Sequence, residues 1–116
     1  MRIGDLSQAS GVSVRMLRYY EEQGLLEAMR GPGRQRIYAD RAVVVVGQIR
    51  TLLTAGLPTK TIRQLMPCML GDGPEVDSCV LDLLHEQLVE LESRIGELQS
   101  ARNSLSGLIL ASKAAT

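Results

Sequence analysis

Arginine and tyrosine side chains recur through the first forty residues at spacings that suit contact with a polyanion. Arg15 and Arg18 are three residues apart, so they share one flank of a predicted helix. Arginine can bond a guanine edge or a phosphate through two N–H groups. Exposed arginines elsewhere are usually only solvated, but here a basic hairpin follows. The pattern predicts binding to duplex DNA, and the candidate contacts are Ser13, Arg15, Arg18, Tyr19, Tyr20, Arg34, Arg36, Tyr38 and Lys60.

Several of these candidates have a second possible role. Tyr19 lies beside the arginines and its hydroxyl would reach phosphate, whereas Tyr20 is as readily a core residue as a contact. Ser13 can cap the second helix, donate to phosphate, or do both. Tyr38 is expected to pack at the base of the hairpin and can also donate to phosphate. Lys60 starts a helix whose N-terminus suits an anion.

Cys68 and Cys79 offer a different chemistry. The two thiols can form a disulfide, react with an electrophile, or hold Cu(I) or another soft ion, but they do not complete a tetrahedral metal site. His85 is a further candidate ligand, although a lone histidine on a helix more often packs or faces solvent. A thiol switch is the functional hypothesis that we prefer, and a soft-metal site and two structural cysteines are the alternatives that stay open. No nucleophile–base arrangement or phosphate loop appears, so the sequence does not predict an enzyme or any other cofactor.

The charge of the 116-residue chain is unevenly distributed. Residues 1–66 contain ten basic and five acidic side chains, and residues 67–116 contain three basic and eight acidic ones, so the two parts carry +5 and −5. A basic part joined to an acidic part indicates one region that binds a polyanion and another that does not. With no Phe or Trp and three Tyr, the core is expected to be small and oligomerisation likewise expected.

The sequence suggests a cytoplasmic protein with no membrane partner. The N-terminus is polar and has no signal-peptide pattern. The run Val43–Val46 is too short to cross a bilayer. Two cysteines without an export signal suit a reducing compartment.

Short helices are predicted through the first two thirds of the chain. The first covers Ile3–Ala9 with Ile3, Leu6 and Ala9 as its apolar stripe, and it ends at Gly11. The second follows Ser13, turns Met16, Leu17 and Tyr20 inward, and stops at Gly24. Residues 29–34 have turn chemistry and 36–38 alternate as a strand, which predicts a small hairpin. A third helix is expected from an Asp40 cap to Ala55, with an inner face of Val43 or Val44, Ile49, Leu52 and Leu53. A fourth begins at Pro58 or Thr59 and packs through Ile62, Leu65 and Met66.

A heptad repeat dominates the last third of the chain. After the break at Pro67–Pro74, Asp77 or Ser78 is expected to cap a helix that runs to about Leu110. At about 1.5 Å per residue it would span roughly 50 Å. Such a seam predicts pairing with a second copy, with folding back onto the N-terminal part as the alternative. Its apolar positions are Leu81, Leu84, Leu88, Leu91, Ile95, Leu98, Leu105 and Ile109, and Arg102 interrupts them once.

With these motifs in order, residues 3–66 resemble the MerR family of bacterial transcription regulators. The resemblance is carried by Ile3-Gly4-Asp5-Leu6, Gly11-Val12-Ser13, Leu17-Arg18-Tyr19-Tyr20-Glu21-Glu22, Gly24-Leu25-Leu26 and Arg36-Ile37-Tyr38. It implies a mainly α fold: a winged helix-turn-helix core over 1–38, connector helices and linker over 39–76, an antiparallel dimerisation coiled coil over 77–111 and a tail over 112–116.

The resemblance also implies a mechanism. A homodimer of this family bends and untwists a promoter whose spacer is too long, so that RNA polymerase, an indirect partner, can use it. The family places its effector chemistry around the head of the dimer helix, where Cys68 and Cys79 lie. The metal-binding loop that follows this helix in metal-sensing members has no counterpart in residues 109–116, so we expect a short form with an unidentified signal. A ligand-independent repressor and a coiled-coil adaptor are the alternatives.

Overall fold

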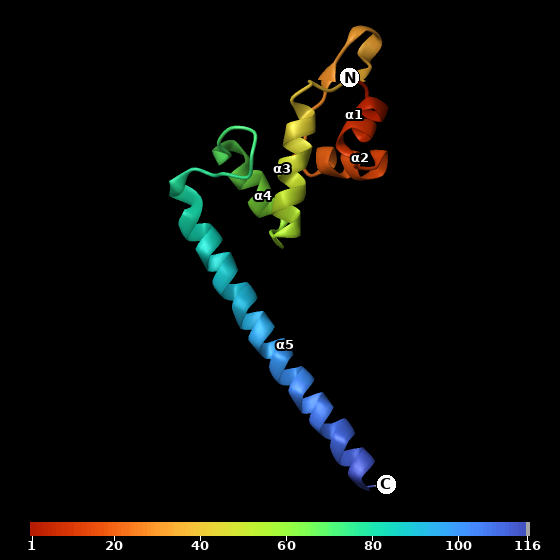
Figure 1. Ribbon diagram of the computed structural model, residues 1–116. Helices are drawn as coiled ribbons and strands as arrows, with labels where there is room; N and C mark the ends of the chain where they lie inside the picture. Colours follow the sequence, from red (N-terminus) through yellow and green to blue (C-terminus); the bar gives the residue numbers. More distant parts are fainter. Residues whose placement is uncertain (116) are drawn as a thin grey trace. The chain divides into compact units, whose positions relative to one another are not determined.

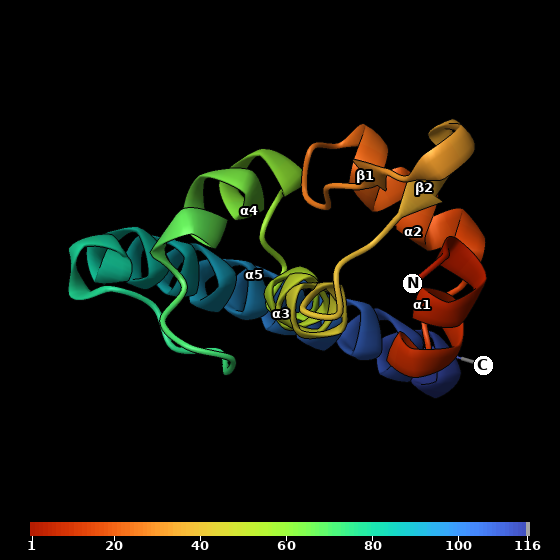
Figure 2. The same cartoon turned by 90° about the horizontal axis from the view of Figure 1, so that it is seen from above.

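The computed structural model describes residues 1–115, which form two compact units. The N-terminal unit covers residues 1–80, and the second unit begins at Leu81. The elements of the N-terminal unit are α1 (Ile3–Ser10), α2 (Val14–Glu22), β1 (Met29–Arg30), β2 (Arg36–Ile37), α3 (Ala42–Thr54) and α4 (Thr59–Leu65). Within it, α1 and α2 lie together beside α3, and the hairpin extends past them (Figures 1 and 2).

The turn between α1 and α2 forms as the sequence predicts. Gly11 ends α1 in the left-handed region at φ 73°, where a residue without a Cβ is favoured. Ser13 then caps α2, because its hydroxyl oxygen accepts a hydrogen bond from the Met16 N–H at 3.2 Å. These two caps fix where one helix stops and the next starts.

The core of the N-terminal unit is mainly aliphatic. Seven of its side chains are fully buried, and all but the first are aliphatic: Tyr38, Leu6, Leu17, Val46, Ile49, Ile62 and Leu65. The predicted inward set was wrong at Met16, which is 40% exposed, because α2 packs through Leu17 and Tyr20, while Met16 shares an outer stripe with Tyr19. In α1, Leu6 is buried, Ile3 is half-buried and Ala9 is exposed. Of the three residues predicted to face the core, only Leu6 is therefore fully buried.

The hairpin predicted as a wing is present. β1 and β2 pair antiparallel, with Met29 opposite Ile37 and Arg30 opposite Arg36. A 3₁₀ turn at Pro32–Arg34 joins them, with Gly33 at φ 74°. Gly31 cannot be replaced without movement, because a Cβ there would lie 2.0 Å from Cδ1 of Ile37.

The start and inner face of α3 differ from the prediction. Arg41 is the N-cap residue and no side chain caps the helix; Asp40 contributes only its backbone carbonyl, which accepts from the Val43 N–H at 3.3 Å. The predicted face was shifted because α3 packs against both α1 and α4. Its buried residues are Ala42, Val46, Gln48, Ile49 and Leu52, whereas Val43, Val44 and Leu53 are only half-buried. In α4, Ile62 and Leu65 are buried, and Met66, which directly follows the helix, is half-buried.

A small hairpin-like loop connects α4 to the second unit. After a 3₁₀ turn at Met66–Cys68, Met69 pairs with Val76 in an isolated antiparallel bridge. The buried side-chain amide of Gln48 donates to the carbonyl oxygens of Gly71 at 3.2 Å and Gly73 at 3.1 Å. The tip of the loop is therefore tied to α3.

The second unit is a single helix, α5 (Leu81–Ala115). A 3₁₀ turn at Ser78–Val80 precedes it, so α5 begins later than the predicted caps. Asp77 caps that turn instead, since its carboxylate accepts from the Cys79 N–H at 3.0 Å. The helix continues past Leu110, which makes the predicted tail helical through Ala115, and residue 116 lies outside the described residues. Within residues 1–115 no helix is both long and apolar enough for a membrane span.

Candidate nucleic-acid interface

The outer face of α2 presents the first group of candidate contacts. Arg15 and Arg18 are exposed, and Tyr19 is 40% exposed. The cap at Ser13 and the buried pair Leu17 and Tyr20 fix the rotation of the helix, so these side chains point away from the core. An exposed helix face with two guanidinium groups suits insertion into a DNA groove.

Arginines from three different segments line one hollow beside the wing. The hollow has a volume of about 370 Å³ and is lined by Arg2, Ile3, Arg18, Gln35 and Arg36. Arg2 precedes α1, Arg18 comes from α2 and Arg36 from β2. Arg2 and Arg36, 34 positions apart in the sequence, therefore bring positive charge to the same hollow. A concave surface with this charge suits an anion.

Glu21 connects α2 to the wing. Its carboxylate lies 2.9 Å from the Arg36 guanidinium and accepts a 2.7 Å hydrogen bond from the Tyr38 hydroxyl. Tyr38 is buried, and burial together with the hydrogen bond and negative charge of Glu21 raises the pKa of its hydroxyl to about 12. The Tyr38 hydroxyl therefore keeps its proton and donates a hydrogen bond to Glu21 within the protein.

The structure separates the predicted contacts into exposed and buried groups. Tyr20 and Tyr38 are 3% and 1% exposed and belong to the core. Ser13 is exposed and its hydroxyl caps α2. Arg34 is exposed at the wing tip, with a left-handed φ of 62° that is uncommon for a residue with a side chain. Lys60 is exposed in the first turn of α4 and does not line the hollow.

Sequence reasoning missed Arg2, Gln35 and Glu21. The Arg2 guanidinium donates to the Gln35 side-chain carbonyl at 2.7 Å, and the backbone N–H of Arg2 donates to Asp5 at 3.1 Å. Arg2 precedes the first motif and Gln35 lies between two candidate arginines, so neither belongs to a helical or strand periodicity. Glu21 was quoted as part of a motif, but its charge gave no sign of pairing with the wing.

The two cysteines are adjacent in space as well as near the same loop. Cys68 is half-buried and Cys79 is exposed, and Cys68 lies close enough to contribute to the raised pKa of the Cys79 thiol. The backbone N–H of Asp77 donates to the Cys68 carbonyl at 2.8 Å, which closes the base of the loop. A hydrogen bond to Asp77 raises the pKa of the Cys79 thiol, with smaller contributions from desolvation, the Asp77 charge and Cys68. The thiolate that reacts with electrophiles is correspondingly less populated at neutral pH.

These donors fit only a low-coordinate metal ion. Residues 1–115 contain no cluster of three or more His, Cys, Asp or Glu side chains able to hold a metal. Two thiols suit a two-coordinate soft ion such as Cu(I) and cannot supply the four ligands of a structural zinc site. His85 is exposed on α5 and is not part of such a cluster.

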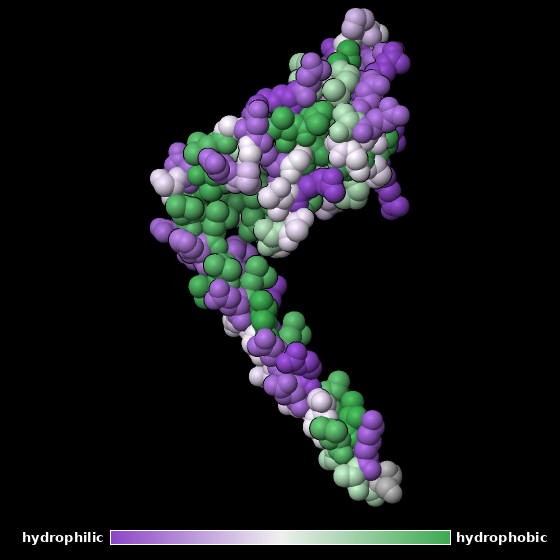
Figure 3. Space-filling model, in the orientation of Figure 1, coloured by the Kyte–Doolittle hydropathy of each residue, from purple (hydrophilic) through white to green (hydrophobic). Residues whose placement is uncertain are grey.

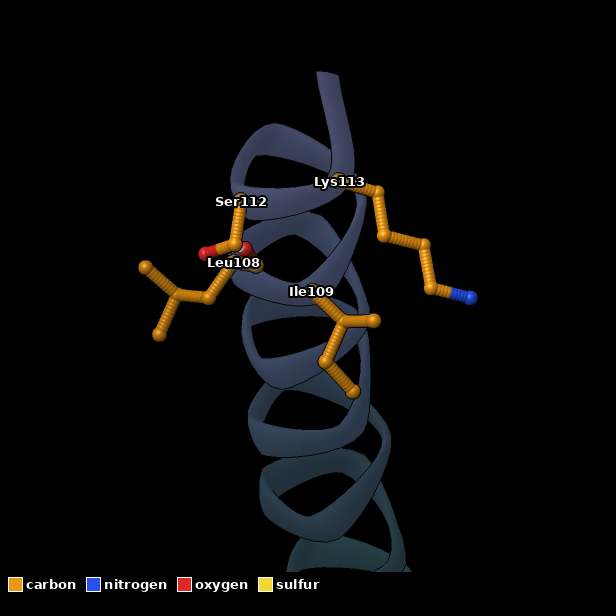
Figure 4. A pocket seen from close by; sticks show the side chains of 4 residues that line it. All are labelled: Leu108, Ile109, Ser112 and Lys113. Carbon is orange, nitrogen blue, oxygen red and sulfur yellow. Dashed lines mark hydrogen bonds between the residues drawn. The ribbon is translucent and has the colours of Figure 1, made fainter. Parts of the chain in front are cut away.

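The seam of α5 exposes large apolar side chains within a single chain. Leu98 is 70% exposed, Leu105 60% and Ile95 53%, and Figure 3 shows apolar surface along this helix. Near its end, Leu108, Ile109, Ser112 and Lys113 surround a shallow hollow (Figure 4).

A winged helix-turn-helix with a cationic face and a long apolar-seamed helix defines a class of DNA-binding regulator. Residues 1–68 match the family described as MerR HTH family regulatory protein. The chain therefore belongs to the MerR family of transcription regulators, and the resemblance noted in its motifs is confirmed.

Its relatives are regulators of the same type. The chain is 33% identical over 109 residues to the heavy metal-dependent transcription regulator 2 of Rhizobium meliloti, covering 93% of this chain and 74% of that protein. It is 34% identical over 110 residues to the HTH-type transcriptional regulator ZntR of Escherichia coli K12, covering 92% and 77%. The crystal structure of PbrR691 from Ralstonia metallidurans in complex with lead(II) superposes with a TM-score of 0.78 at 30% identity, covering 93% of this chain and 84% of that one.

Proposed function

We propose that this protein is a homodimeric promoter-DNA regulator in which α2 enters the major groove and the wing grips the adjacent backbone. The observation that carries the proposal is the convergence of Arg2, Arg18 and Arg36 on one hollow next to the exposed face of α2. In this proposal the guanidinium groups of the hollow provide phosphate contacts that fix register, while Arg15 on the exposed face of α2 reaches base edges.

The dimer is proposed to form through α5 with the two helices antiparallel. Residues 81–97 carry five acidic side chains and one arginine, whereas residues 98–115 carry Arg102 and Lys113 and no acidic side chain. Antiparallel pairing places the acidic half of one helix against the basic half of the other. A parallel, in-register pair would instead place Arg102 against its own copy inside the seam, which costs free energy without a counter-charge.

Cross-linking of single cysteines tests the orientation. In a protein with Cys68→Ser and Cys79→Ser, a cysteine introduced at Ser112 near one end of α5 should not form a disulfide with its copy in an antiparallel dimer. A cysteine at Leu98, nearer the middle, should cross-link more readily. Efficient self-cross-linking at position 112 would show that the helices are parallel.

DNA binding is tested by footprinting the DNA upstream of the protein's own gene across a salt series. Wild type should protect a symmetric site, and Arg18→Ala should lose it, with the affinity falling steeply as salt rises because phosphate binding releases counterions. An adaptor that binds only protein would show no such salt dependence.

Activation is proposed to work by deforming an over-long promoter spacer, as membership of this family suggests. Transcription with purified polymerase from promoters that differ only in spacer length tests this. Stimulation restricted to the longer spacers supports deformation, because bending and untwisting help only where the promoter elements are out of register. Inhibition at every length supports a plain repressor.

The signal is proposed to be a soft metal ion bound at Cys68 and Cys79. The proximity of Cys68 to Cys79 and the heavy-metal and lead(II) names of the relatives support a metal, and the raised pKa of Cys79 argues against a thiolate already activated for electrophiles. Both cysteines would bind the ion after losing their protons. The loop they anchor is tied to α3 through Gln48, which gives the signal a route to the DNA-binding unit.

Metal titration of the reduced protein tests this assignment. Cu(I) should bind and change the induced transcription, and Cys68→Ser and Cys79→Ser should each abolish that change. A response to peroxide without metal would support the thiol switch. A response that survives both substitutions would make the cysteines structural.

A further inference from the structure

The hollow beside the wing has features of a site built for a single anion. Arg2, Arg18 and Arg36 line it, and the sequence motifs identify only two of these three residues as contacts. Two of these arginines are held by acceptors. The Arg2 guanidinium donates to the Gln35 side-chain carbonyl at 2.7 Å, and the Arg36 guanidinium lies 2.9 Å from the Glu21 carboxylate. Arg18 projects from α2, whose rotation is fixed by its buried side.

The charges around the hollow remain positive after these contacts are counted. Glu21 is the carboxylate that pairs with Arg36, and its side chain is 18% exposed while that of Arg36 is 48% exposed. Asp5 is engaged by the backbone N–H of Arg2. The Gln35 amide is neutral, so the three guanidinium charges exceed the two negative charges of Glu21 and Asp5 and leave a net charge of +1.

We propose that this hollow binds one backbone phosphate of the DNA, with Arg2 as a ligand beside Arg18 and Arg36, and with Glu21 as a positioning residue that holds Arg36 in place. The proposal rests on the DNA-binding function proposed above. A phosphate oxygen accepts hydrogen bonds from planar guanidinium groups, and three such groups from separate segments can surround it. Arginines already held by Gln35 and Glu21 lose less side-chain freedom when the phosphate enters.

Neutralising individual DNA phosphates tests the proposal directly. The probe is a duplex recovered by selecting random-sequence DNA on the untagged wild-type protein, with one phosphate at a time replaced by methylphosphonate. Wild type should lose about fivefold in affinity at one particular phosphate in each half-site. Arg2→Gln should bind the unmodified duplex about fivefold more weakly and should no longer respond to that replacement.

Arg50→Gln is the matched control, because it removes the same charge from the N-terminal unit outside the hollow. It should keep the response at that phosphate. If Arg2→Gln responds to every methylphosphonate as wild type does, Arg2 is not a phosphate ligand and the proposal is overturned. If wild type itself shows no salt-dependent DNA binding, the failure lies with the proposed function instead.

The positioning role of Glu21 has its own measurement. Glu21→Gln should lower affinity for the selected duplex about tenfold, while affinity for a shuffled duplex rises because a negative charge has been removed. Glu22→Gln removes the same charge from an exposed neighbour on α2 and should raise both affinities slightly. If the two variants behave alike, Glu21 acts only through charge and does not position Arg36. Thermal unfolding of both variants identifies any loss of fold.

Discussion

The two units of this protein contain the same types of aliphatic side chain but differ in how far these are buried. In the N-terminal unit, side chains such as Leu17 and Ile49 are fully buried within one chain. In α5, none is buried, and Leu98 is 70% exposed. A helix of 35 residues gains little from intrinsic propensity alone, because most helical stability in water comes from packing an apolar face. The N-terminal unit therefore completes a core within one chain, whereas α5 leaves its apolar seam exposed, as the proposed dimer requires.

The largest effect is expected from a charge placed in the seam of α5. Leu98→Glu should destabilise the proposed dimer by about 5 kcal/mol, because each copy would lose a leucine from the paired seam and two like charges would be brought together. Analytical ultracentrifugation should show monomers. Ser100→Glu, two residues away off the seam, is the control and should remain dimeric; dissociation of both variants would mean that charge anywhere on α5 is harmful.

Shortening an aliphatic side chain should affect the free energy of unfolding very differently in the two units. Ile49→Ala should lower the free energy of unfolding of the N-terminal unit by about 3 kcal/mol, because Ile49 is fully buried in α3. Leu110→Ala, at a position that is 66% exposed and outside the heptad seam, should change it by less than about 0.5 kcal/mol. Urea denaturation measures both. Equal losses would show that Leu110 is buried in the assembled protein.

The contact between Gln48 and the cysteine loop should have a smaller effect, and one that extends to the thiols. Gln48→Leu removes both hydrogen bonds to the Gly71 and Gly73 carbonyls and should cost about 1–2 kcal/mol. The loosened loop should let a thiol reagent label Cys68 about tenfold faster. Gln64→Leu on the exposed face of α4 should leave the labelling rate unchanged. Unchanged labelling in Gln48→Leu would mean that the loop holds its shape without α3.

The smallest predicted effect is the pH dependence of the bond between Tyr38 and Glu21. The folded pKa of Tyr38 is raised from 10.0 to about 12, so the folded state holds this proton more tightly than the unfolded state does. The stabilisation is complete below pH 10 and is lost as the pH rises toward 12. Below pH 10, the free energy of unfolding of wild type should exceed that of Tyr38→Phe by about 1 kcal/mol. Between pH 10 and 12 this difference in the free energy of unfolding should shrink. A pH-independent difference would contradict the raised pKa.

Local signals explain which elements were predictable. Gly11 and Ser13 mark the turn between α1 and α2 because left-handed backbone and side-chain capping depend on neighbouring atoms alone. The hairpin was predictable for the same reason. The Asp40 cap was predicted wrongly, since no side chain caps α3. The buried face of α3 was also predicted wrongly, because contacts with α1 and α4 decide which side of this valine-rich helix is buried.

The sequence by itself determined the motif series, the helix-turn-helix boundaries, the charge division and the heptad seam, since each depends on spacing along one segment. Only the tertiary structure decided that the Tyr38 hydroxyl binds Glu21, that Arg2 lies with Arg18 and Arg36, and that Gln48 holds the loop between the two cysteines. Each of these contacts joins residues from separate segments. Their positions depend on how the packed core orients those segments, which periodicity within a single segment does not specify.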